Sequence, residues 1–234
     1  DKEIIKNMTI EFPVKKSIAI VGESGAGKST LVDLITLIHQ PQKGSIYIDD
    51  KDSNDINKAS WRNQIGYVSQ DTVIFDDTIR NNISMWNCKN FNDDDLEERI
   101  KEAARKANIL EFIETLPDGF DSHVGDRGIL LSGGQKQRLF IARELFREPN
   151  LLILDEATSS LDSASEKEIQ KSIDSLKGEI SVVIIAHRLS TIRNIDLVYV
   201  LHNGKIIESG SYQELANAKE SNFSKIIALQ SLEE

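Results

Sequence analysis

The chain has 234 residues but only one cysteine, Cys88. A single cysteine cannot form a disulfide within the chain, so the sequence excludes a small extracellular scaffold held together by disulfides. We therefore expect a reducing compartment, and we expect Cys88 to be an ordinary small side chain in or near the core.

Long hydrophobic runs are also lacking. The apolar runs are short, such as VVIIA at residues 182–186 and LLIL at residues 151–154, whereas a membrane-spanning helix needs about 20 apolar residues. No signal-peptide pattern is present. The first residue is Asp1 rather than Met, from which we expect a piece of a longer protein. These features predict a globular domain that does not itself cross a membrane.

Basic charge is scarce. The chain has 28 Lys and Arg against 38 Asp and Glu, which gives a formal net charge of −10. Proteins that bind nucleic acids neutralise phosphates with a basic surface, so the composition predicts no nucleic-acid partner. At 39% hydrophobic residues, the chain is nevertheless long enough to bury a substantial core.

The apolar runs predict an α/β fold. Three short runs rich in branched residues, 18–21, 151–154 and 182–186, have the character of buried parallel strands. Helical patterns at 28–37, 96–107 and 163–176 separate them, and this alternation is typical of a mostly parallel sheet. Residues 71–150 have mainly helical patterning, so we predict a core of residues 1–70 and 151–234 with 71–150 inserted as a helical subdomain.

Chemically capable groups follow each predicted strand. Glycines follow Val21, the pair Asp155–Glu156 follows Leu154, and His187 follows Ala186. Ligands of such folds bind beyond the carboxyl ends of the strands. The sequence therefore predicts one functional site at that edge of the sheet.

The first group is a phosphate-binding loop. Residues 22–29 read GESGAGKS and match G-x-x-x-x-G-K-[ST] between a strand and a helix. Backbone N–H groups and the helix N-terminus favour a phosphate there, and the alternative of a glycine-rich turn that binds nothing leaves the lysine and serine unexplained. We expect Lys28 to reach the β- and γ-phosphates, Ser29 to hold Mg²⁺ and Thr30 to touch the α-phosphate. The expected contact residues are Gly22, Glu23, Ser24, Gly25, Ala26, Gly27, Lys28, Ser29 and Thr30.

The other two strand ends supply acid and base groups. Asp155 and Glu156 point to opposite sides of a strand end, so we expect Asp155 to hold the Mg²⁺ shell and Glu156 to act as general base on the attacking water. The alternative is an acidic pair that only caps the next helix. We expect His187 to hydrogen-bond the γ-phosphate, although a lone histidine is more often structural.

A second glycine pair stands in LSGGQ at residues 131–135. Ser132 and Gln135 have the spacing of a capping box at a helix start, so both glycines fall in a first turn, where N–H groups are unpaired. The loop 22–29 and the segment 131–135 would then be two phosphate-binding sites, called here the first and second cradles. One nucleotide does not need both in one chain. A head-to-tail dimer accounts for both, because each chain's second cradle then closes on the γ-phosphate held by the other chain.

These motifs together resemble the nucleotide-binding domain of an ABC transporter. GESGAGKST is similar to Walker A, LLILDE to Walker B and LSGGQ to the family signature. Gln70 in YVSQD matches the Q-loop, Asp162 in SSLD the D-loop, and His187 in AHR the switch histidine. TVIFDDTIRNNI at 72–83 and SHVGDRG at 122–128 resemble exporter segments, although Asp126 stands where glutamate is usual.

The resemblance implies a P-loop NTPase with a RecA-like core, an antiparallel β part and the inserted helical subdomain. It implies ATP as ligand, with Mg²⁺ held by Ser29, Gln70 and Asp155, and an ATPase reaction in which Lys28, Gln70, Glu156 and His187 take part. It implies a partner that is a second copy or a paralogue, and a transmembrane domain contacted through Gln70 and Val124–Gly128 at the cytoplasmic face of the membrane. Residues expected to contact nucleotide across the dimer are Ser132, Gly133, Gly134, Gln135 and Asp162.

The N-terminal stretch 4–22 resembles the second and third strands of the family fold. The family's first strand, with an aromatic residue that stacks on adenine, would precede Asp1. Phe12 is expected within a strand and in the core rather than at the base. We therefore expect this chain to bind ATP weakly and to discriminate poorly against GTP.

Two other functions remain in view. A regulatory domain that binds ATP without useful turnover would lack the base or the switch histidine, whereas Glu156 and His187 are both present. An ABC ATPase of DNA repair or translation would carry long coiled coils or tandem domains, and neither pattern is seen. The sequence favours an export ATPase.

Overall fold

The computed structural model describes residues 3–87, 93–157, 161–186, 188–218 and 221–230. A six-stranded sheet in the order β4-β5-β6-β1-β7-β8 forms its centre. All neighbouring strands pair in parallel except β7 and β8, which are antiparallel. The strands are β1 (Ser17–Val21), β4 (Ile65–Val68), β5 (Leu151–Asp155), β6 (Ser181–Ile185), β7 (Leu197–His202) and β8 (Lys205–Gly210). The predicted mostly parallel α/β fold is confirmed, and each of the three predicted strands forms within one residue of its expected bounds.

A separate antiparallel hairpin joins β2 (Tyr47–Ile48) and β3 (Lys51–Asp52). The helices are α1 (Lys28–Ile35), α2 (Lys58–Asn63), α3 (Ile79–Ser84), α4 (Asp93–Lys106), α5 (Leu110–Glu114), α6 (Gly133–Phe146), α7 (Ser163–Ser175), α8 (Tyr212–Asn217) and α9 (Asn222–Gln230). Short 3₁₀ turns are η1 (Ser53–Asp55), η2 (Gly119–Asp121), η3 (Asp126–Gly128) and η4 (Leu189–Ile192). Within the described ranges, no helix is both long and apolar enough to cross a bilayer.

Several helices begin at side chains that cap them. Asn57, Thr78, Asp162 and Ser211 each accept a hydrogen bond from a backbone N–H of the first turn that follows. Such caps satisfy donors that have no partner inside the helix and stabilise its start by about 1 kcal/mol. The helix boundaries are thus fixed largely by local sequence.

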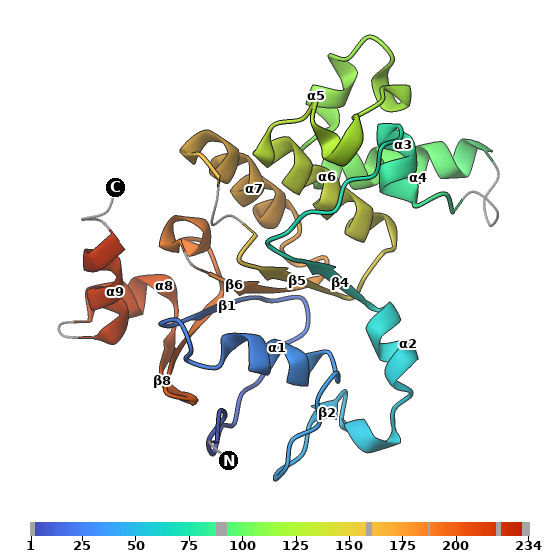
Figure 1. Ribbon diagram of the computed structural model, residues 1–234. Coiled ribbons are helices and arrows are strands. Elements are labelled where there is room, and N and C mark those ends of the chain that lie inside the picture. Colours follow the sequence, from blue (N-terminus) through green and yellow to red (C-terminus); the bar gives the residue numbers. More distant parts are fainter. Residues whose placement is uncertain (1–2, 88–92, 158–160, 187, 219–220, 231–234) are drawn as a thin grey trace.

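The sheet is covered on both faces, with α1 on one and α6 and α7 on the other (Figure 1). Alternate strand residues serve the two layers, because successive side chains of a strand point to opposite faces. Ile20, Ile153 and Ile185 pack in the layer with Leu31 and Val32 of α1. Their strand neighbours, among them Ala19, Leu152, Leu154 and Ile184, join the cluster that contains residues of α4, α6 and α7. Burial on both faces explains why these strands are continuous apolar runs.

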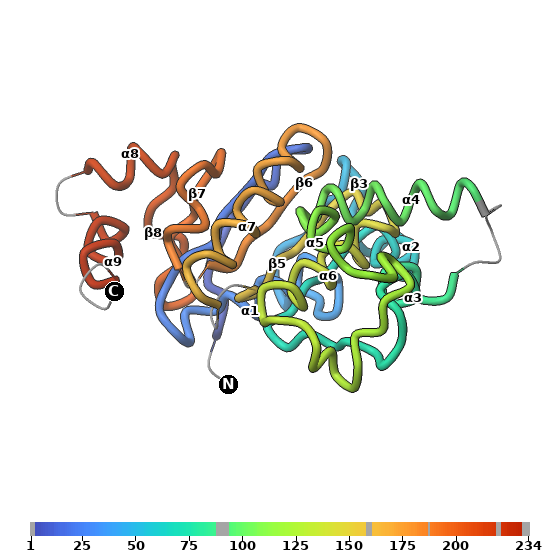
Figure 2. The backbone as a smooth tube through the Cα atoms, turned by 90° about the horizontal axis from the view of Figure 1, so that it is seen from above, coloured from blue at the N-terminus to red at the C-terminus, as the bar shows by residue number. Residues whose placement is uncertain are grey.

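Helices α3 to α6 lie between β4 and β5 in the sequence and gather at one end of the molecule, opposite α8 and α9 (Figure 2). They bury their own apolar side chains, such as Ile83 of α3, Ile100 of α4 and Leu139 of α6. The same buried cluster continues into the sheet through Leu152 and Leu154. The division into a core of 1–70 and 151–234 and a subdomain of 71–150 therefore remains a prediction.

The expected strand before residue 17 is not formed, and that prediction was wrong. Residues 3–16 contain no strand, and their backbone is held by separate bonds, such as the one from Lys6 N to Gly204 O at 2.8 Å. A strand needs a hydrogen-bonded neighbour along its length. Phe12 is consequently outside any strand, but it packs on the core and meets Tyr199 edge to face at 6.4 Å between ring centroids.

Candidate functional site

The predicted site residues gather where the parallel strands end. The loop 22–27 follows β1, Asp155 ends β5 and Glu156 follows it, with β6 between these two strands in the sheet. His187, expected at the end of β6, lies outside the described residues, as does Cys88. The edge of the sheet thus brings the glycine loop and the acidic pair together from positions about 130 residues apart in sequence.

The loop after β1 closes around the ammonium group of Lys28. The Lys28 Nζ atom donates to the carbonyl oxygens of Gly22 at 2.8 Å and Glu23 at 3.1 Å, and the side chain is almost fully buried. Two of the glycines are required by the backbone. A Cβ atom at Gly22 would lie 2.2 Å from the Leu201 carbonyl oxygen, and Gly27 has a φ of 107°, which L side chains rarely adopt.

Gly27 is also the N-cap of α1, and it offers no side-chain bond to the first turn. The first N–H groups of α1 are therefore left for a ligand, at the end of the helix that carries partial positive charge. A helix start of this kind favours a phosphate group. Ser29, in the same turn, is exposed to solvent.

The negative charges of Asp155 and Glu156 act on the ammonium group of Lys28. Burial lowers the pKa of Lys28, while the negative charges of Glu156 and Asp155 act in the opposite direction. Glu156 has a φ of +52°, a left-handed conformation that costs a residue with a side chain free energy of order 1–3 kcal/mol and that is concentrated at functional sites. Its backbone N–H bonds to the Ile185 carbonyl at 3.1 Å, which fixes the strained residue against β6.

Tyr67 of β4 is a site residue that the sequence analysis missed. Its hydroxyl donates to Asp155 Oδ2 at 2.7 Å. Burial raises the pKa of Tyr67 well above its usual range, with further contributions from the hydrogen bond to Asp155 and the charges of Asp155 and Asp33. The phenol therefore stays a protonated donor at neutral pH. No local sequence signal would have found it, because the contact depends on the register between β4 and β5.

The three predicted metal ligands offer oxygen donors, the type that Mg²⁺ prefers. Ser29 lies at the start of α1, Asp155 at the end of β5, and Gln70 is exposed just beyond β4. In the part of the chain that the structure describes, no three His, Cys, Asp or Glu side chains form a metal-binding group. Magnesium is usually held by one or two carboxylates with phosphates and waters rather than by a protein cage, so this donor set fits it.

The LSGGQ segment forms the predicted capping box. Ser132 Oγ accepts from Gln135 N at 3.2 Å, and Gln135 Oε1 accepts from Ser132 N at 2.8 Å. Ser132 and Gly133 remain exposed. The structure gives Gly134 a second reason to be glycine, because a Cβ atom there would lie 2.3 Å from Ser165 Oγ.

Ser165 belongs to the first turn of α7, which Asp162 caps. Asp162 Oδ1 accepts from the backbone N–H of Ala164 at 3.0 Å and of Ser165 at 2.9 Å. These bonds lower the pKa of Asp162, with the backbone bond from Ser165 as the largest cause. The start of α6 and the predicted D-loop residue are therefore parts of one packed unit.

The two regions expected to face a membrane domain are adjacent. Val124 N donates to Asp77 O at 3.1 Å, and a Cβ atom at Gly128 would lie 3.0 Å from Ile74 Cγ2. Arg143 of α6 holds the segment that follows Gln70 by donating to Val73 O at 2.6 Å. Val124–Gly128 and the residues after Gln70 thus form one surface region, in which Asp126 and Arg127 are exposed.

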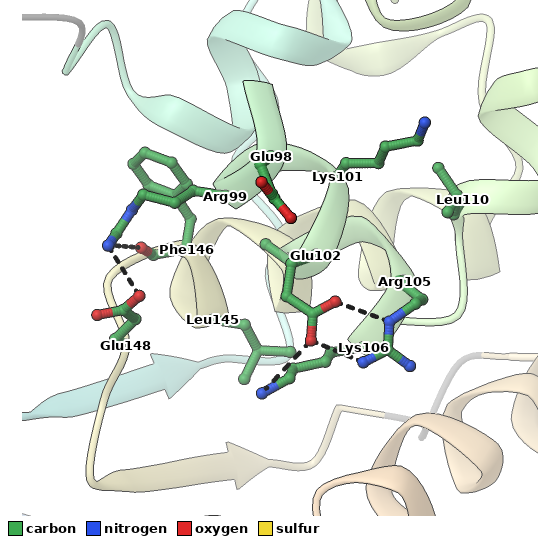
Figure 3. Close-up of a pocket in the computed structure, with 11 residues that line it drawn as sticks. Glu98, Arg99, Lys101, Glu102, Arg105, Lys106, Leu110, Leu145, Phe146 and Glu148 are labelled. Carbon is green, nitrogen blue, oxygen red and sulfur yellow. Dashed lines mark hydrogen bonds and ion pairs between the residues drawn. The ribbon is translucent and has the colours of Figure 1, made fainter. Parts of the chain in front are cut away.

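A separate hollow of about 420 Å³ lies between α4 and the end of α6 (Figure 3). Several of its charged side chains are paired with one another, as in Arg99–Glu148 at 2.8 Å and Arg105–Glu102 at 2.6 Å. None of the residues that line it is a predicted site residue. We therefore do not assign the nucleotide to this hollow.

Comparison with known proteins identifies the family. The ABC transporter family model matches residues 5–159. The heterocyst differentiation ATP-binding protein HepA of Nostoc sp. is 49% identical over 215 residues, which cover 92% of this chain and 35% of that protein. The ATP-dependent lipid A-core flippase of Desulfotalea psychrophila is 47% identical over 214 residues, which cover 92% of this chain and 36% of the flippase.

A solved structure agrees with these matches. The structure of a bacterial Atm1-family ABC exporter with ATP bound superposes with a TM-score of 0.84 at 38% identity, covering 98% of this chain and 40% of the exporter chain. The chain spans about a third of the length of the two curated relatives named above. It belongs to the ABC transporter family and is a nucleotide-binding ATPase domain of the exporter type.

Proposed function

We propose that this domain binds ATP with Mg²⁺, hydrolyses it in a head-to-tail dimer, and thereby powers export through a transmembrane domain outside this sequence. The observation that carries the proposal is the glycine loop closed around Lys28, with the carboxylates of Asp155 and Glu156 close enough to act on its charge. A loop that only makes a turn has no need of a buried ammonium group.

The nucleotide phosphates occupy the loop and the start of α1. The ammonium group of Lys28 exchanges its carbonyl partners for β- and γ-phosphate oxygens, to which it is better matched in charge. Thr30 contacts the α-phosphate, and the uncapped N–H groups of α1 complete the cradle. The contacting residues are Gly22, Glu23, Ser24, Gly25, Ala26, Gly27, Lys28, Ser29 and Thr30.

Ser29, Gln70 and Asp155 are the residues that would hold the metal ion. When bound, Mg²⁺ neutralises phosphate charge and orients the γ-phosphate for attack. Asp155 acts through its carboxylate at the end of β5, and Gln70 from the loop beyond β4. That loop is braced by α6, because Gln137 Nε2 donates to Ser69 O at 3.5 Å.

Glu156 is the proposed general base. A carboxylate that accepts the proton of the attacking water contributes about 10²–10⁴-fold to the rate. The left-handed backbone of Glu156 and its bond to Ile185 O support a fixed position at the strand end. We assign His187 a hydrogen bond to the γ-phosphate, and we assign Gln70 to the orientation of the water.

The second cradle acts on the partner's nucleotide. Within one chain, α1 and α6 lie on opposite faces of the sheet (Figure 1), so Lys28 and the exposed Ser132 belong to different layers. Two copies, or a copy and a paralogue, arranged head to tail place each second cradle on the other chain's γ-phosphate. Its residues are Ser132, Gly133, Gly134, Gln135 and Asp162.

When the dimer closes, its motion is transmitted to the membrane domain through contacts at Gln70 and Val124–Gly128, at the cytoplasmic face of the membrane. The adjacency of these two regions through Ile74, Asp77 and Gly128 supports a single docking area. We propose no nucleic-acid partner, in keeping with the net charge of −10.

Steady-state phosphate release from MgATP tests this function. We expect release by the wild-type chain, its loss in Lys28→Ala, and wild-type release by Lys43→Ala, which removes an exposed lysine outside the site. MgATP binding by the wild type without phosphate release would instead favour a regulatory domain. Absence of both binding and release would refute the proposal.

A further inference from the structure

Tyr67 lies beside the proposed metal site but is not among its ligands. In the register of β4 and β5, Tyr67 is paired with Ile153, and Asp155 is the next residue of β5 on that same face. The tyrosine side chain runs along the sheet toward the carboxyl ends of the strands. Its hydroxyl meets Asp155 Oδ2 at 2.7 Å, a short distance typical of a bond to a charged acceptor.

The position of Tyr67 is fixed from both sides. Among the described strands, β4 lies at one edge of the sheet, so one side of its backbone faces away from β5. The Tyr67 N–H on that side donates to Glu144 Oε2 of α6 at 3.3 Å, and Glu144 itself is buried. Sheet pairing with β5 and the bond to Glu144 thus hold the ring where its hydroxyl reaches Asp155.

We propose that Tyr67 is a positioning residue for the magnesium ion, an inference that rests on the function proposed above. The Tyr67 hydroxyl holds Asp155 through Oδ2 and would leave Oδ1 as the oxygen that holds the metal ion. Among the described residues, Tyr67 provides the only hydrogen bond to the Asp155 carboxylate. Ligating carboxylates are generally oriented by such outer partners, whose loss typically weakens metal binding about 10–100-fold.

The surroundings of Tyr67 determine how much metal binding weakens when its hydroxyl is removed. The residue is 38% exposed and borders a hollow of about 410 Å³ that Asp33, Arg62 and Arg147 also line. Asp155 is itself only half-buried, so water can replace part of the bond that is lost when the hydroxyl is removed. We therefore expect a change near the lower end of the range, about tenfold.

The test compares nucleotide binding with and without the metal. Binding of a non-hydrolysable ATP analogue to wild type and Tyr67→Phe is measured by calorimetry in EDTA and across a Mg²⁺ titration, and the Mn²⁺ complex is followed by electron paramagnetic resonance. We expect unchanged affinity in EDTA and an increase of about tenfold in the metal concentration needed for half-saturation. Tyr199→Phe is the matched control, because it removes a hydroxyl that bonds Glu11 O at 3.0 Å, outside the site.

Tyr67→Phe with a metal requirement within twofold of wild type would overturn the inference, as would an equal loss of affinity in EDTA and in Mg²⁺. A second measurement uses Asp155→Ala, which removes the carboxylate that accepts the Tyr67 hydrogen bond. In that background, adding Tyr67→Phe should cause no further change in the metal requirement, whereas two independent losses would contradict the link. If the wild type shows no metal-dependent binding, the proposed function itself fails, and the two failures are thereby distinguished.

Discussion

The two glycine-bearing cradles of this domain are built differently. At the start of α1, the N-cap Gly27 gives no side-chain bond to the first turn, and the buried ammonium group of Lys28 occupies the loop. At the start of α6, Ser132 and Gln135 already satisfy each other's backbone N–H groups. The first cradle thus has backbone N–H groups without side-chain partners and a lysine of its own, whereas in the second the Ser132 and Gln135 side chains already bond backbone N–H groups. Under the proposed function, the first cradle would bind the phosphates of its own chain's nucleotide, and the second would make contact only when a nucleotide held by another chain arrives.

The largest expected effect separates chemistry from binding at the first cradle. Glu156→Gln keeps the side-chain shape but cannot accept the proton of water, so phosphate release should fall by about 10²–10⁴-fold. Binding of MgATP should be retained, because Lys28 and the loop are untouched. Calorimetry and a phosphate-release assay check the two parts. Turnover within a few-fold of wild type would exclude Glu156 as the base.

The next effect isolates the second cradle. In the Glu156→Gln background, light scattering should show monomers without nucleotide and dimers with MgATP. Adding Ser132→Arg should abolish the dimer through bulk and misplaced charge, while each monomer still binds ATP through its first cradle. Ser45→Arg places the same side chain at an exposed position outside the site and should still dimerise. A Ser132→Arg variant that dimerises as well as its parent would refute action in trans.

A smaller effect tests why the second cradle contains glycine. Gly134→Ala should destabilise the fold by about 1–3 kcal/mol, the usual cost of overpacking, because its Cβ would lie 2.3 Å from Ser165 Oγ. Adding Ser165→Gly should restore most of that loss. At Gly133 the nearest atom is Leu161 Cδ2 at 3.3 Å, so Gly133→Ala should change stability by less than about 1 kcal/mol. Urea unfolding without nucleotide measures all three. Equal costs at both glycines would contradict the packing explanation.

The smallest expected effect concerns Asp162, which caps α7 next to the second cradle. Backbone N–H bonds hold the pKa of Asp162 below its usual range, so the charged form stabilises the fold above the ordinary carboxyl pKa and this contribution is lost as pH falls through the lowered pKa. Asp162→Asn keeps a capping oxygen but has no charge to lose. The stability difference between wild type and variant should therefore shrink from pH 7 toward pH 3. A constant difference would show that the charge of Asp162 is unimportant there.

Much of this architecture could be predicted from local sequence. The continuous apolar runs that form β1, β5 and β6 indicate strands buried on both faces. The capping box at Ser132 and Gln135 depends only on a spacing of three residues. What sequence reasoning missed depends on register between distant segments. The bond from Tyr67 to Asp155 spans 88 positions, and the contact of Gly134 with Ser165 joins the starts of two helices. The expected N-terminal strand was wrong because an apolar pattern does not supply the neighbouring strand it needs. His187 keeps its predicted role as a proposal.

The close approach of Gly134 to Ser165 has a mechanical consequence. Two helices that touch through long side chains can slide or roll by exchanging rotamers, but Gly134 has no side chain, so only the short Ser165 side chain could adjust. We therefore expect the starts of α6 and α7 to move as one rigid unit. Any rotation of α6 about its own axis must displace the first turn of α7, and Asp162 with it. The second cradle and Asp162 are therefore expected to move together.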